Sequence, residues 1–504
     1  MLLTAGVTCW RVGRARRAAV LVDVADYFIA ARAAMLKARS SIHLLNWAFD
    51  PDTLLDPQPG ANGPDEDRIG RFLVELAHAR PHLDVRILCW RSAFPIAATQ
   101  RFFPHRAKRC FEGTRVRFLL DASVPLGACQ HQKVMVIDDA VAFCGGGDIC
   151  PDRWDTAEHL DDDPRRQAAG LSDRDFPARH EVMALVDGEP ARSLGTLFRE
   201  RWRRATGEAP PPAEAATSDP WPASVAPRFA DVSVGLSRTL PAWRGQTETR
   251  ENEALHLEAI AAARRCIYLE NQYVTSPLIA AALGRRLAEP DGPEVVLIST
   301  EHSPSWFDQM TMDRTRTLFL RRLRAADAHG RLRAYVPRTE KGRLIIVHAK
   351  LTIIDDWLLR VGSANLNNRS GGFDTECDLA LEAGAGDPAA RAEIAATRER
   401  LIAHWLGAAP SAVGAAIEAC GAVGPAIERL RAEGRGRLTP LKPDGLGPLA
   451  AVIARLHLGD PSSTADSWRP WRRVRTFRAR LAQIEAEPPH RRLADRARSF
   501  TTAS

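Results

Sequence analysis

Two stretches of the chain share one pattern: HQKVMVIDDAVAFCGGGD at residues 131–148 and HAKLTIIDDWLLRVGSAN at residues 348–365. In each, a lysine follows a histidine by two positions, an aspartate follows five further on, and a glycine beside a second small residue comes seven after that. The two histidines are 348 − 131 = 217 positions apart in a chain of 504 residues. We therefore expect one unit made twice, with both copies meeting at a shared site.

Helix and strand patterns alternate around both copies. In the first half, helical spacing covers 22–38, 68–80 and 191–205, and strand patterns cover 41–50, 85–90, 116–121 and 180–188. In the second half, helical spacing covers 251–265, 276–288 and 312–327, and strand patterns cover 232–237, 266–274, 294–300 and 331–337. This alternation predicts an α/β fold of two pseudo-twofold-related lobes, each a mixed β-sheet flanked by helices.

A Pro/Ala-rich segment marks the expected domain boundary. Residues 207–227 read GEAPPPAEAATSDPWPASVAP, which is typical of a linker. We expect a first lobe at 1–206, with residues 1–20 only weakly patterned, and a second lobe at 228–408. Residues 409–504 have no counterpart in the first half and predict a helical, basic C-terminal extension.

Composition limits the class of protein and its partners. An apolar share of 45% and a charged share of 26% are globular values, and the net charge of +7 favours anionic partners. The nine cysteines form no CxxC pair, which argues against a disulfide framework or a zinc site. No run of 18 apolar residues and no signal-peptide pattern are present. We expect a cytoplasmic protein that touches membranes peripherally, with export by another route left open.

Strand parity separates the motif residues into two groups. Because side chains alternate faces along a strand, His131 shares a face with Lys133, and His348 shares a face with Lys350. Asp138 and Asp355 have the opposite parity, so we expect both to support the strand ends by accepting backbone hydrogen bonds.

Paired histidines and lysines suit attack on a phosphodiester. One neutral imidazole attacks phosphorus and forms a phosphohistidine, and the second protonates the leaving alkoxide. The lysines, with Ser363 and Asn365, are expected to hold the phosphoryl oxygens, so the chemistry needs no metal or cofactor. Glycines at 145, 146 and 362 would let the backbone approach those oxygens. Each histidine also needs a carboxylate to fix its tautomer, and Asp155 and Glu376 are the candidates.

These motifs resemble those of the phospholipase D superfamily, whose signature HxKx4D with a following GG or GS occurs twice. Two further stretches, GGGDICPDRWDT and YLENQY, are similar to segments of its eukaryotic-type members, and the resemblance covers about residues 10–405. It implies a single site between two lobes, with His131 as nucleophile and His348 as general acid/base. It places Glu270, Asn271 and Gln272 near the substrate. Gly145, Gly146, Gly362 and Asp148 are expected to be structural, because a carboxylate at Asp148 would repel a phosphate.

The resemblance leaves several functions open. The first is a phospholipase D that hydrolyses, or transfers, a glycerophospholipid to give phosphatidate and free headgroup. A phosphatidyltransferase of the cardiolipin synthase type, a nuclease and a non-catalytic lipid-binding scaffold are the alternatives. We expect phospholipid at an anionic membrane surface as the partner, no nucleic acid, and a monomer, because both motifs lie in one chain.

Three further stretches carry an open choice between function and packing. Residues 303–312 (SPSWFDQMTM) suit a loop that dips into lipid or an ordinary core segment. Residues 467–480 interleave tryptophan with arginine, which suits anionic headgroups, nucleic acid or a solvated helix. The acidic run at 161–163 lacks the ligand spacing of a calcium site and predicts a solvated loop.

Overall fold

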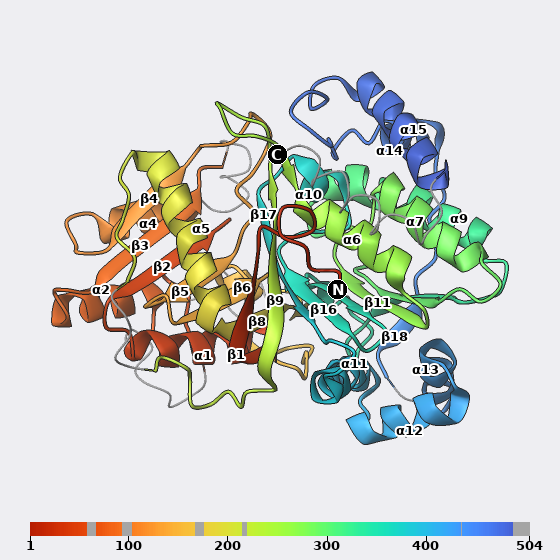
Figure 1. Ribbon diagram of the computed structural model, residues 1–504, viewed down its shortest axis with the longest axis horizontal. Coiled ribbons are helices and arrows are strands. Elements are labelled where there is room, and N and C mark those ends of the chain that lie inside the picture. Colours follow the sequence, from red (N-terminus) through yellow and green to blue (C-terminus); the bar gives the residue numbers. More distant parts are fainter. Residues whose placement is uncertain (58–66, 93–102, 167–175, 214–218, 435, 487–504) are drawn as a thin grey trace.

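The computed structural model describes residues 1–57, 67–92, 103–166, 176–213, 219–434 and 436–486, which form a mixed sheet with helices packed on it (Figure 1). The first half contains β1 (Arg11–Val22), α1 (Val24–Leu36), β2 (Ser41–Asn46), α2 (Ile69–Ala79), β3 (Asp84–Trp90), α4 (Phe103–Phe111), β4 (Arg117–Asp121), β5 (Val134–Ile137), β6 (Val141–Gly145), β7 (Arg179–His180), β8 (Val182–Asp187) and α5 (Gly188–Thr206).

The second half repeats this order of elements. It contains β9 (Phe229–Leu240), β10 (Thr249–Arg250), α6 (Glu251–Ala262), β11 (Cys266–Asn271), α7 (Pro277–Ala288), β12 (Glu294–Ile298), α8 (Trp306–Asp308), a π-helical turn η3 (Gln309–Asp313), α9 (Arg314–Ala326), β13 (Leu332–Pro337), β14 (Ile346–Val347), β15 (Lys350–Ile354), β16 (Leu358–Gly362), α10 (Asn368–Gly372), β17 (Glu376–Glu382) and α11 (Pro388–Leu406).

Strand order shows the twofold repeat directly. Outward from β1 the order is β8-β6-β5-β2-β3-β4, and outward from β9 it is β17-β16-β15-β11-β12-β13. Pairs β2–β3 and β3–β4 are parallel, as are their counterparts β11–β12 and β12–β13, while the remaining pairs along both arms are antiparallel. The predicted α/β class with pseudo-twofold lobes is confirmed.

The two expected sheets are joined into one. Strands β1 and β9 pair antiparallel at the centre of a 16-stranded sheet, with β8 and β17 on their outer sides. The sequence left residues 1–20 weakly patterned because arginines at 11, 14, 16 and 17 mask the alternation of β1. Ala15 and Ala18, which lie on opposite faces of this strand, are both fully buried.

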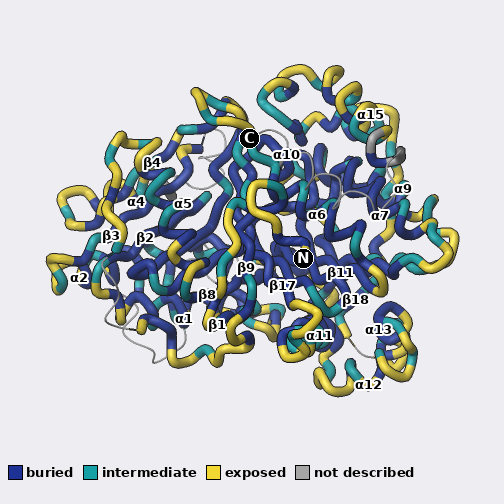
Figure 2. Tube along the Cα trace, in the orientation of Figure 1, coloured by how far each residue is buried: buried dark blue, intermediate teal, exposed yellow. Residues whose placement is uncertain are grey.

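Strands on the two sides of the central pair are buried on both faces, because helices cover both sides of the sheet. Every residue of β2, β5, β6 and β8 is buried, and the interior is continuous across the two halves (Figure 2). One core cluster contains Leu45 and Val136 from the first half together with Val361 and Leu379 from the second. The halves therefore share a hydrophobic core.

The C-terminal extension is helical, as predicted, and packs against the second half. It contains α12 (Pro410–Cys420), α13 (Val423–Ala432), β18 (Leu438–Pro440), α14 (Pro448–Arg455) and α15 (Pro470–Ala486). Strand β18 extends the sheet at β13, α12 and α13 contact α11, α14 contacts α9, and α15 contacts α7. Within the described part of the chain no helix could cross a membrane alone, while α12 and α13 together have the necessary length and composition but bend by 117°.

Candidate active site between the two halves

His131 lies immediately before β5 and is held by the second half. Its backbone N–H donates to the carbonyl of Thr375 at 3.0 Å. Its Nδ1 lies 3.0 and 2.9 Å from the two carboxylate oxygens of Glu376, which opens β17. The sequence predicts Glu376 as a tautomer-fixing carboxylate, and the structure places it on the histidine of the opposite half.

His348 has the equivalent arrangement, related by the pseudo-twofold axis. Its backbone N–H donates to the carbonyl of His180 at 2.8 Å, and its Nδ1 is hydrogen-bonded to Glu181, the residue before β8. Each half therefore orients the histidine of the other. Because Nδ1 of both rings is engaged, Nε2 is the atom left for chemistry.

The Glu376 carboxylate is surrounded by donors. Hydroxyl Oγ of Ser363 lies 2.5 Å from one oxygen, and Oγ of Ser370 lies 2.6 Å from the other. Both hydroxyls accept a backbone N–H, from Cys377 and Asn365 respectively, so both donate their proton to Glu376. Burial raises the pKa of Glu376 to about 8, and the two serines oppose that rise. Ser363 therefore supports Glu376, and its predicted role in holding phosphoryl oxygens is wrong.

Both motif lysines are buried and bond back to their own histidine. The Nζ of Lys133 donates to the carbonyl of His131 at 2.8 Å, and Nζ of Lys350 donates to that of His348. Lys133 also lies 3.5 Å from a carboxylate oxygen of Asp148. Lys350 lies 3.3 Å from the amide oxygen of Gln272. Burial, reinforced by the charge of Lys133, lowers the pKa of Lys350 to about 7.

The imidazoles are neutral near pH 7. Burial lowers the pKa of His131 and of His348 well below the usual value, and the charges of Lys133 and Lys350 lower both further. A neutral His131 ring whose Nδ1–H donates to Glu376 carries a lone pair on Nε2. The His131 side chain is 16% exposed and that of His348 is 7% exposed, so His131 is the more accessible of the two rings.

Two arginines beside His348 were not predicted from the sequence. The charges of Arg153 and Arg179 lower the pKa of His348, and both side chains are buried. Each is within 3.0–3.5 Å of Asp152, yet Nε of Arg153 and both Nε and Nη1 of Arg179 have no hydrogen-bond partner among the described residues. Guanidinium groups left with free donors next to a histidine suit binding of anionic oxygens.

Comparisons with known proteins agree with this geometry. A family model described as "Cardiolipin synthase, PLD-like domain" matches residues 256–397. The chain is 25% identical to "Phospholipase D1" of Saccharomyces cerevisiae over 458 residues, covering 72% of this chain and 26% of that protein. It is 24% identical to "Phospholipase D2" of Bos taurus over 471 residues, covering 72% of this chain and 49% of that protein. These similarities support membership of the phospholipase D superfamily.

A solved structure of similar fold covers nearly the whole chain. The crystal structure of a phosphatidylserine synthase from Haemophilus influenzae has a TM-score of 0.52 at 13% identity, covering 94% of this chain and 96% of that one. At this identity the likeness concerns the fold. The chain spans about a quarter to a third of the length of several curated relatives, such as the yeast protein at 26% and a Dictyostelium discoideum "Phospholipase D A" at 32%.

The superfamily aspartates lie at the ends of their strands. Asp138 accepts backbone N–H groups from residues 39, 40 and 41 at 2.7–2.8 Å, and Asp355 accepts those of residues 264, 265 and 266 at 2.8–3.0 Å. Both adopt a left-handed backbone, with φ of 55° and 51°. These contacts fasten each motif strand to the preceding helix-to-strand turn and leave the aspartates away from the histidines.

Asp155 does not contact either motif histidine. Its carboxylate lies 2.8 Å from Nδ1 of His159 and 3.0 Å from Nη1 of Arg166, and it accepts the backbone N–H of Arg179. The prediction that it fixes a motif tautomer is wrong, because its loop folds back beside α1. Glu181 takes that place, and the aligned strands HEVMALVD and TECDLALE carry the signal that could have found it.

The motif glycines make room for neighbouring side chains. A Cβ added at Gly146, the position equivalent to Ser363, would collide with the Glu181 carboxylate. A Cβ at Gly145 or Gly362 would collide with residues of the adjacent strand, Met183 or Asp378 respectively. These glycines therefore allow tight packing against the neighbouring strand and against Glu181. Asn365 keeps an amide oxygen that has no hydrogen-bond partner among the described residues.

The side chains of Glu270 and Asn271 form hydrogen bonds within the protein interior. Glu270 accepts from the Tyr268 hydroxyl at 2.6 Å and from Trp405 Nε1 at 2.8 Å, and its other oxygen lies 2.8 Å from His180 Nε2. With its oxygens occupied and no exposed surface, its predicted substrate contact is wrong. Asn271 accepts two backbone N–H groups, from residues 273 and 366. Of these three predicted residues, only Gln272 reaches a motif lysine.

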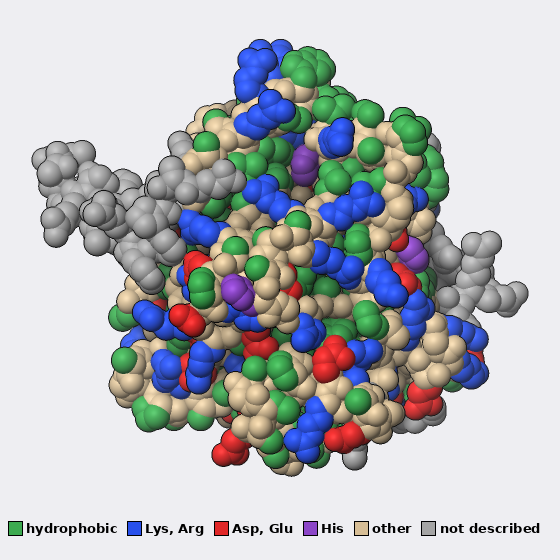
Figure 3. Space-filling view, turned by 90° about the vertical axis from the view of Figure 1, so that its right-hand side faces the viewer, with side chains coloured by type: hydrophobic (Ala, Val, Ile, Leu, Met, Phe, Trp, Pro, Cys, Tyr) green, Lys and Arg blue, Asp and Glu red, His purple; other side chains and the backbone are tan. Residues whose placement is uncertain are grey.

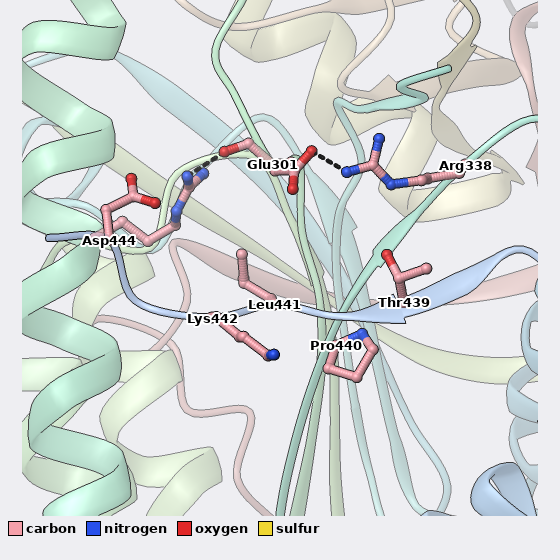
Figure 4. A pocket seen from close by; sticks show the side chains of 8 residues that line it. Glu301, Arg338, Thr439, Pro440, Leu441, Lys442 and Asp444 are labelled. Atoms are coloured by element: carbon pink, nitrogen blue, oxygen red, sulfur yellow. Dashed lines mark hydrogen bonds and ion pairs between the residues drawn. The ribbon is translucent and has the colours of Figure 1, made fainter. Parts of the chain in front are cut away.

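A separate pocket of ≈ 440 Å³ is lined by residues from α9, from the segments that follow β12 and β13, and from β18 and the segment after it (Figure 4). Its Glu301 pairs with Arg338, and the guanidinium of Arg316 donates to the backbone carbonyl of Glu301. The motif histidines do not line it. Its lining residues are Glu301, Arg316, Arg338, Thr439, Pro440, Leu441, Lys442 and Asp444.

Proposed function

We propose that this protein is a phosphodiesterase of the phospholipase D type, which cleaves a glycerophospholipid to phosphatidate and a free headgroup alcohol. One observation carries the proposal: the two motif imidazoles are each oriented through Nδ1 by a buried glutamate of the opposite half, beside buried lysines. Curated relatives named phospholipase D support the substrate class.

In the first step, Nε2 of His131 attacks phosphorus and the bond to the headgroup oxygen breaks. The His348–Glu181 pair supplies the proton that this oxygen takes. Burial raises the pKa of Glu181, which favours a proton held between the glutamate and Nδ1 of His348. When His348 donates its Nε2 proton to the headgroup oxygen, the proton shared with Glu181 moves to Nδ1 of His348. The His348–Glu181 pair therefore loses one proton in total.

In the second step, water attacks phosphorus, His348 Nε2 takes its proton, and the P–N bond to His131 breaks. Phosphatidate leaves and the starting protonation states return. Negative charge on the phosphoryl oxygens is stabilised by Lys133 and Lys350 and by the unpartnered donors of Arg153 and Arg179. The protein's own residues thus provide attack, proton transfer and charge stabilisation.

Exposed apolar side chains support a lipid surface as the place of action. Leu126, 73% exposed, lies on the segment that leads to His131, and Trp468 lies beside the neighbouring Gly127. Trp306 and Phe307 on α8 are also exposed. Hydrophobic and basic side chains lie side by side over the upper part of the face in Figure 3. This composition suits insertion among anionic headgroups.

Phosphatidyl transfer is a second candidate. The matched family model carries the words cardiolipin synthase, and the solved structure of similar fold is a phosphatidylserine synthase. The same phosphohistidine would then pass its phosphatidyl group to an alcohol in place of water.

Vesicles of phosphatidylcholine with phosphatidylglycerol test both candidates when incubated with and without 1-butanol. We expect phosphatidate without the alcohol, phosphatidylbutanol with it, and neither product with His131→Ala or His348→Ala. His256→Gln, a buried histidine outside the site, is the matched control. Cardiolipin formed from phosphatidylglycerol would favour the transferase. Plasmid nicking without any lipid product would contradict the proposal.

A further inference from the structure

A second cluster of titratable side chains lies directly behind Glu181. Asp23, His159, His180 and His404 each present one ligand atom, and these atoms all lie within 4.8 Å of one another. They come from four separate segments: the N-cap of α1, the loop after residue 155, β7 and the last turn of α11. All but His404 are fully buried, and the His404 side chain is 9% exposed.

Three of these atoms form a triangle of the right size for an ion. Nε2 of His159 lies 3.0 Å from Nε2 of His404, and the Asp23 Oδ2 atom lies 3.8 and 3.9 Å from them. The circle through a triangle with sides of 3.0, 3.8 and 3.9 Å has a radius of about 2.1 Å, which matches Zn–N and Zn–O bonds of about 2.0–2.2 Å.

The surrounding hydrogen bonds prepare these atoms as ligands. Nδ1 of His159 lies 2.8 Å from Asp155, which leaves its Nε2 with a lone pair. His180 bridges Oδ1 of Asp23 at 3.0 Å and Glu270 at 2.8 Å. Asp23 Oδ2 is buried and has no hydrogen-bond partner among the described residues. A buried, unpartnered carboxylate oxygen is costly unless a cation meets it.

The fold does not require this cluster. In the second half, Thr375 takes the position equivalent to His180 and makes the same backbone contact, accepting from the N–H of a motif histidine. Asp23 also adopts φ 69° and ψ 155°, a backbone conformation that favours glycine. The twin position therefore lacks the histidine that His180 contributes to this cluster.

We propose that Asp23 Oδ2, His159 Nε2 and His404 Nε2 bind a divalent transition-metal ion, best matched by zinc, with a fourth position open to water. His180 positions Asp23 and is not a ligand. The ion would fasten α11 of the second half to α1 and the 156–160 loop of the first half. It takes no part in phosphodiester cleavage. This site was not expected from the sequence, because its ligands are up to 381 positions apart, from 23 to 404.

The site would also support the catalytic glutamate. The Asp23 N–H donates to the carbonyl of Glu181 at 2.8 Å, and the N–H of Glu181 lies 3.2 Å from Asp23 Oδ1. Fixing Asp23 therefore fixes the backbone from which Glu181 reaches His348. Metal loss should loosen that attachment without removing any group that acts on phosphate.

Metal analysis of the full-length protein, purified without a histidine tag, tests the proposal. We expect about one zinc per chain in the wild type, less than a tenth of that in His159→Gln/His404→Gln, and wild-type content in His256→Gln. After chelation, added zinc should raise the wild-type Tm by about 3 °C and leave the double variant unchanged.

Cobalt gives a readout that does not depend on any variant folding. Co²⁺ added to chelated wild type should produce visible absorption of a four-coordinate nitrogen and oxygen site, and one equivalent of zinc should remove it. Absence of bound metal, of this absorption and of a Tm shift in the wild type would overturn the proposal. In that case His404 donates a hydrogen bond to His159 and the cluster is a hydrogen-bond network alone.

Discussion

At the residue scale, the structure differs from the sequence-based prediction in which carboxylate, Glu181 or Asp155, orients a motif histidine. Glu181 holds Nδ1 of His348, whereas Asp155 holds His159. We predict that Glu181→Gln lowers kcat by about 10²- to 10⁴-fold, because an amide does not stabilise the required tautomer and proton. Asp155→Asn should change kcat by less than about 10-fold and lower the Tm. Initial rates on a short-chain, soluble phosphatidylcholine measure kcat. A larger loss of kcat in Asp155→Asn than in Glu181→Gln would contradict the assignment of Glu181 to His348.

Two further residues set the pH dependence of the free enzyme. The Glu376 carboxylate must be ionised to accept from His131, and its pKa is raised to about 8. Lys350 must be protonated to stabilise phosphate charge, and its pKa is lowered to about 7. Activity should fall at low pH because Glu376 becomes protonated, and at high pH because Lys350 loses its proton. The value of kcat/KM should therefore follow a narrow bell with its maximum between pH 7 and 8. Lys350→Arg, which stays charged, should extend the alkaline limb. A flat profile from pH 6 to 9 would contradict this assignment.

The motif aspartates predict a stability effect separate from chemistry. Asp138 accepts three backbone N–H groups and has a positive φ that asparagine tolerates. Asp138→Asn should therefore keep the backbone turn and lower the free energy of unfolding by about 1–3 kcal/mol through weaker acceptors. Urea unfolding measures this loss. The folded fraction should keep wild-type kcat, and a stable but inactive variant would place Asp138 in the chemistry.

The repeated motif predicts much of the site. The other site residues are brought together by tertiary contacts that the spacing of residues in the sequence does not predict. The histidines and lysines follow from two copies of one pattern, and Glu376 follows from its place a loop's length after the second copy. Glu181 was also within reach, because its strand aligns with that of Glu376, but loop length favoured Asp155. Arg153 and Arg179 gave no periodic signal. Asp23 and His404 meet only because α11 packs against the first half, which is a property of the tertiary structure.

At the scale of elements, β1 shows how charge hides a strand. Arginines share both faces of β1 with small buried residues, so the sequence shows no apolar face for this strand. Helices were easier to predict because apolar spacing persists over three or more turns. The 207–227 boundary remains a prediction, with its residues 214–218 outside the described part of the chain. The acidic run at 161–163, expected to be solvated, instead pairs with Lys341 and Arg343.

Helices α8 and α15 carry a prediction about lipid surfaces. Trp306 on α8 and Trp468 just before α15 are 73% and 69% exposed. We predict that Trp306→Ala/Trp468→Ala weakens binding to anionic vesicles by about 10-fold or more, because each ring loses apolar burial worth about 1.5 kcal/mol or more. Vesicle sedimentation measures binding, and Val12→Ala, on the exposed face of β1, is the control. Cleavage of soluble short-chain lipid should be unchanged. Equal loss with vesicles and soluble lipid would place the tryptophans in the site itself.

At the scale of the whole molecule, the crossed glutamates make the halves interdependent. Neither half alone contains a complete histidine–glutamate pair, since His131 uses Glu376 and His348 uses Glu181. The pairing of β1 with β9 and the shared core give the separated halves a surface to rejoin. We predict that residues 1–213 or 219–504 expressed alone yield no lipid turnover, while co-expression restores it as one complex containing a single copy of each half.

Mixed pairs of halves sharpen this test. A first half carrying Glu181→Gln should impair a normal second half, because the missing carboxylate belongs to His348 across the junction. A first half carrying Asp155→Asn should complement it far better, since Asp155 contacts neither motif histidine. Size-exclusion chromatography would confirm that each pair assembles before rates are compared. Turnover by either half alone would mean that two copies of one motif can build a site between them, and that the crossed arrangement is dispensable.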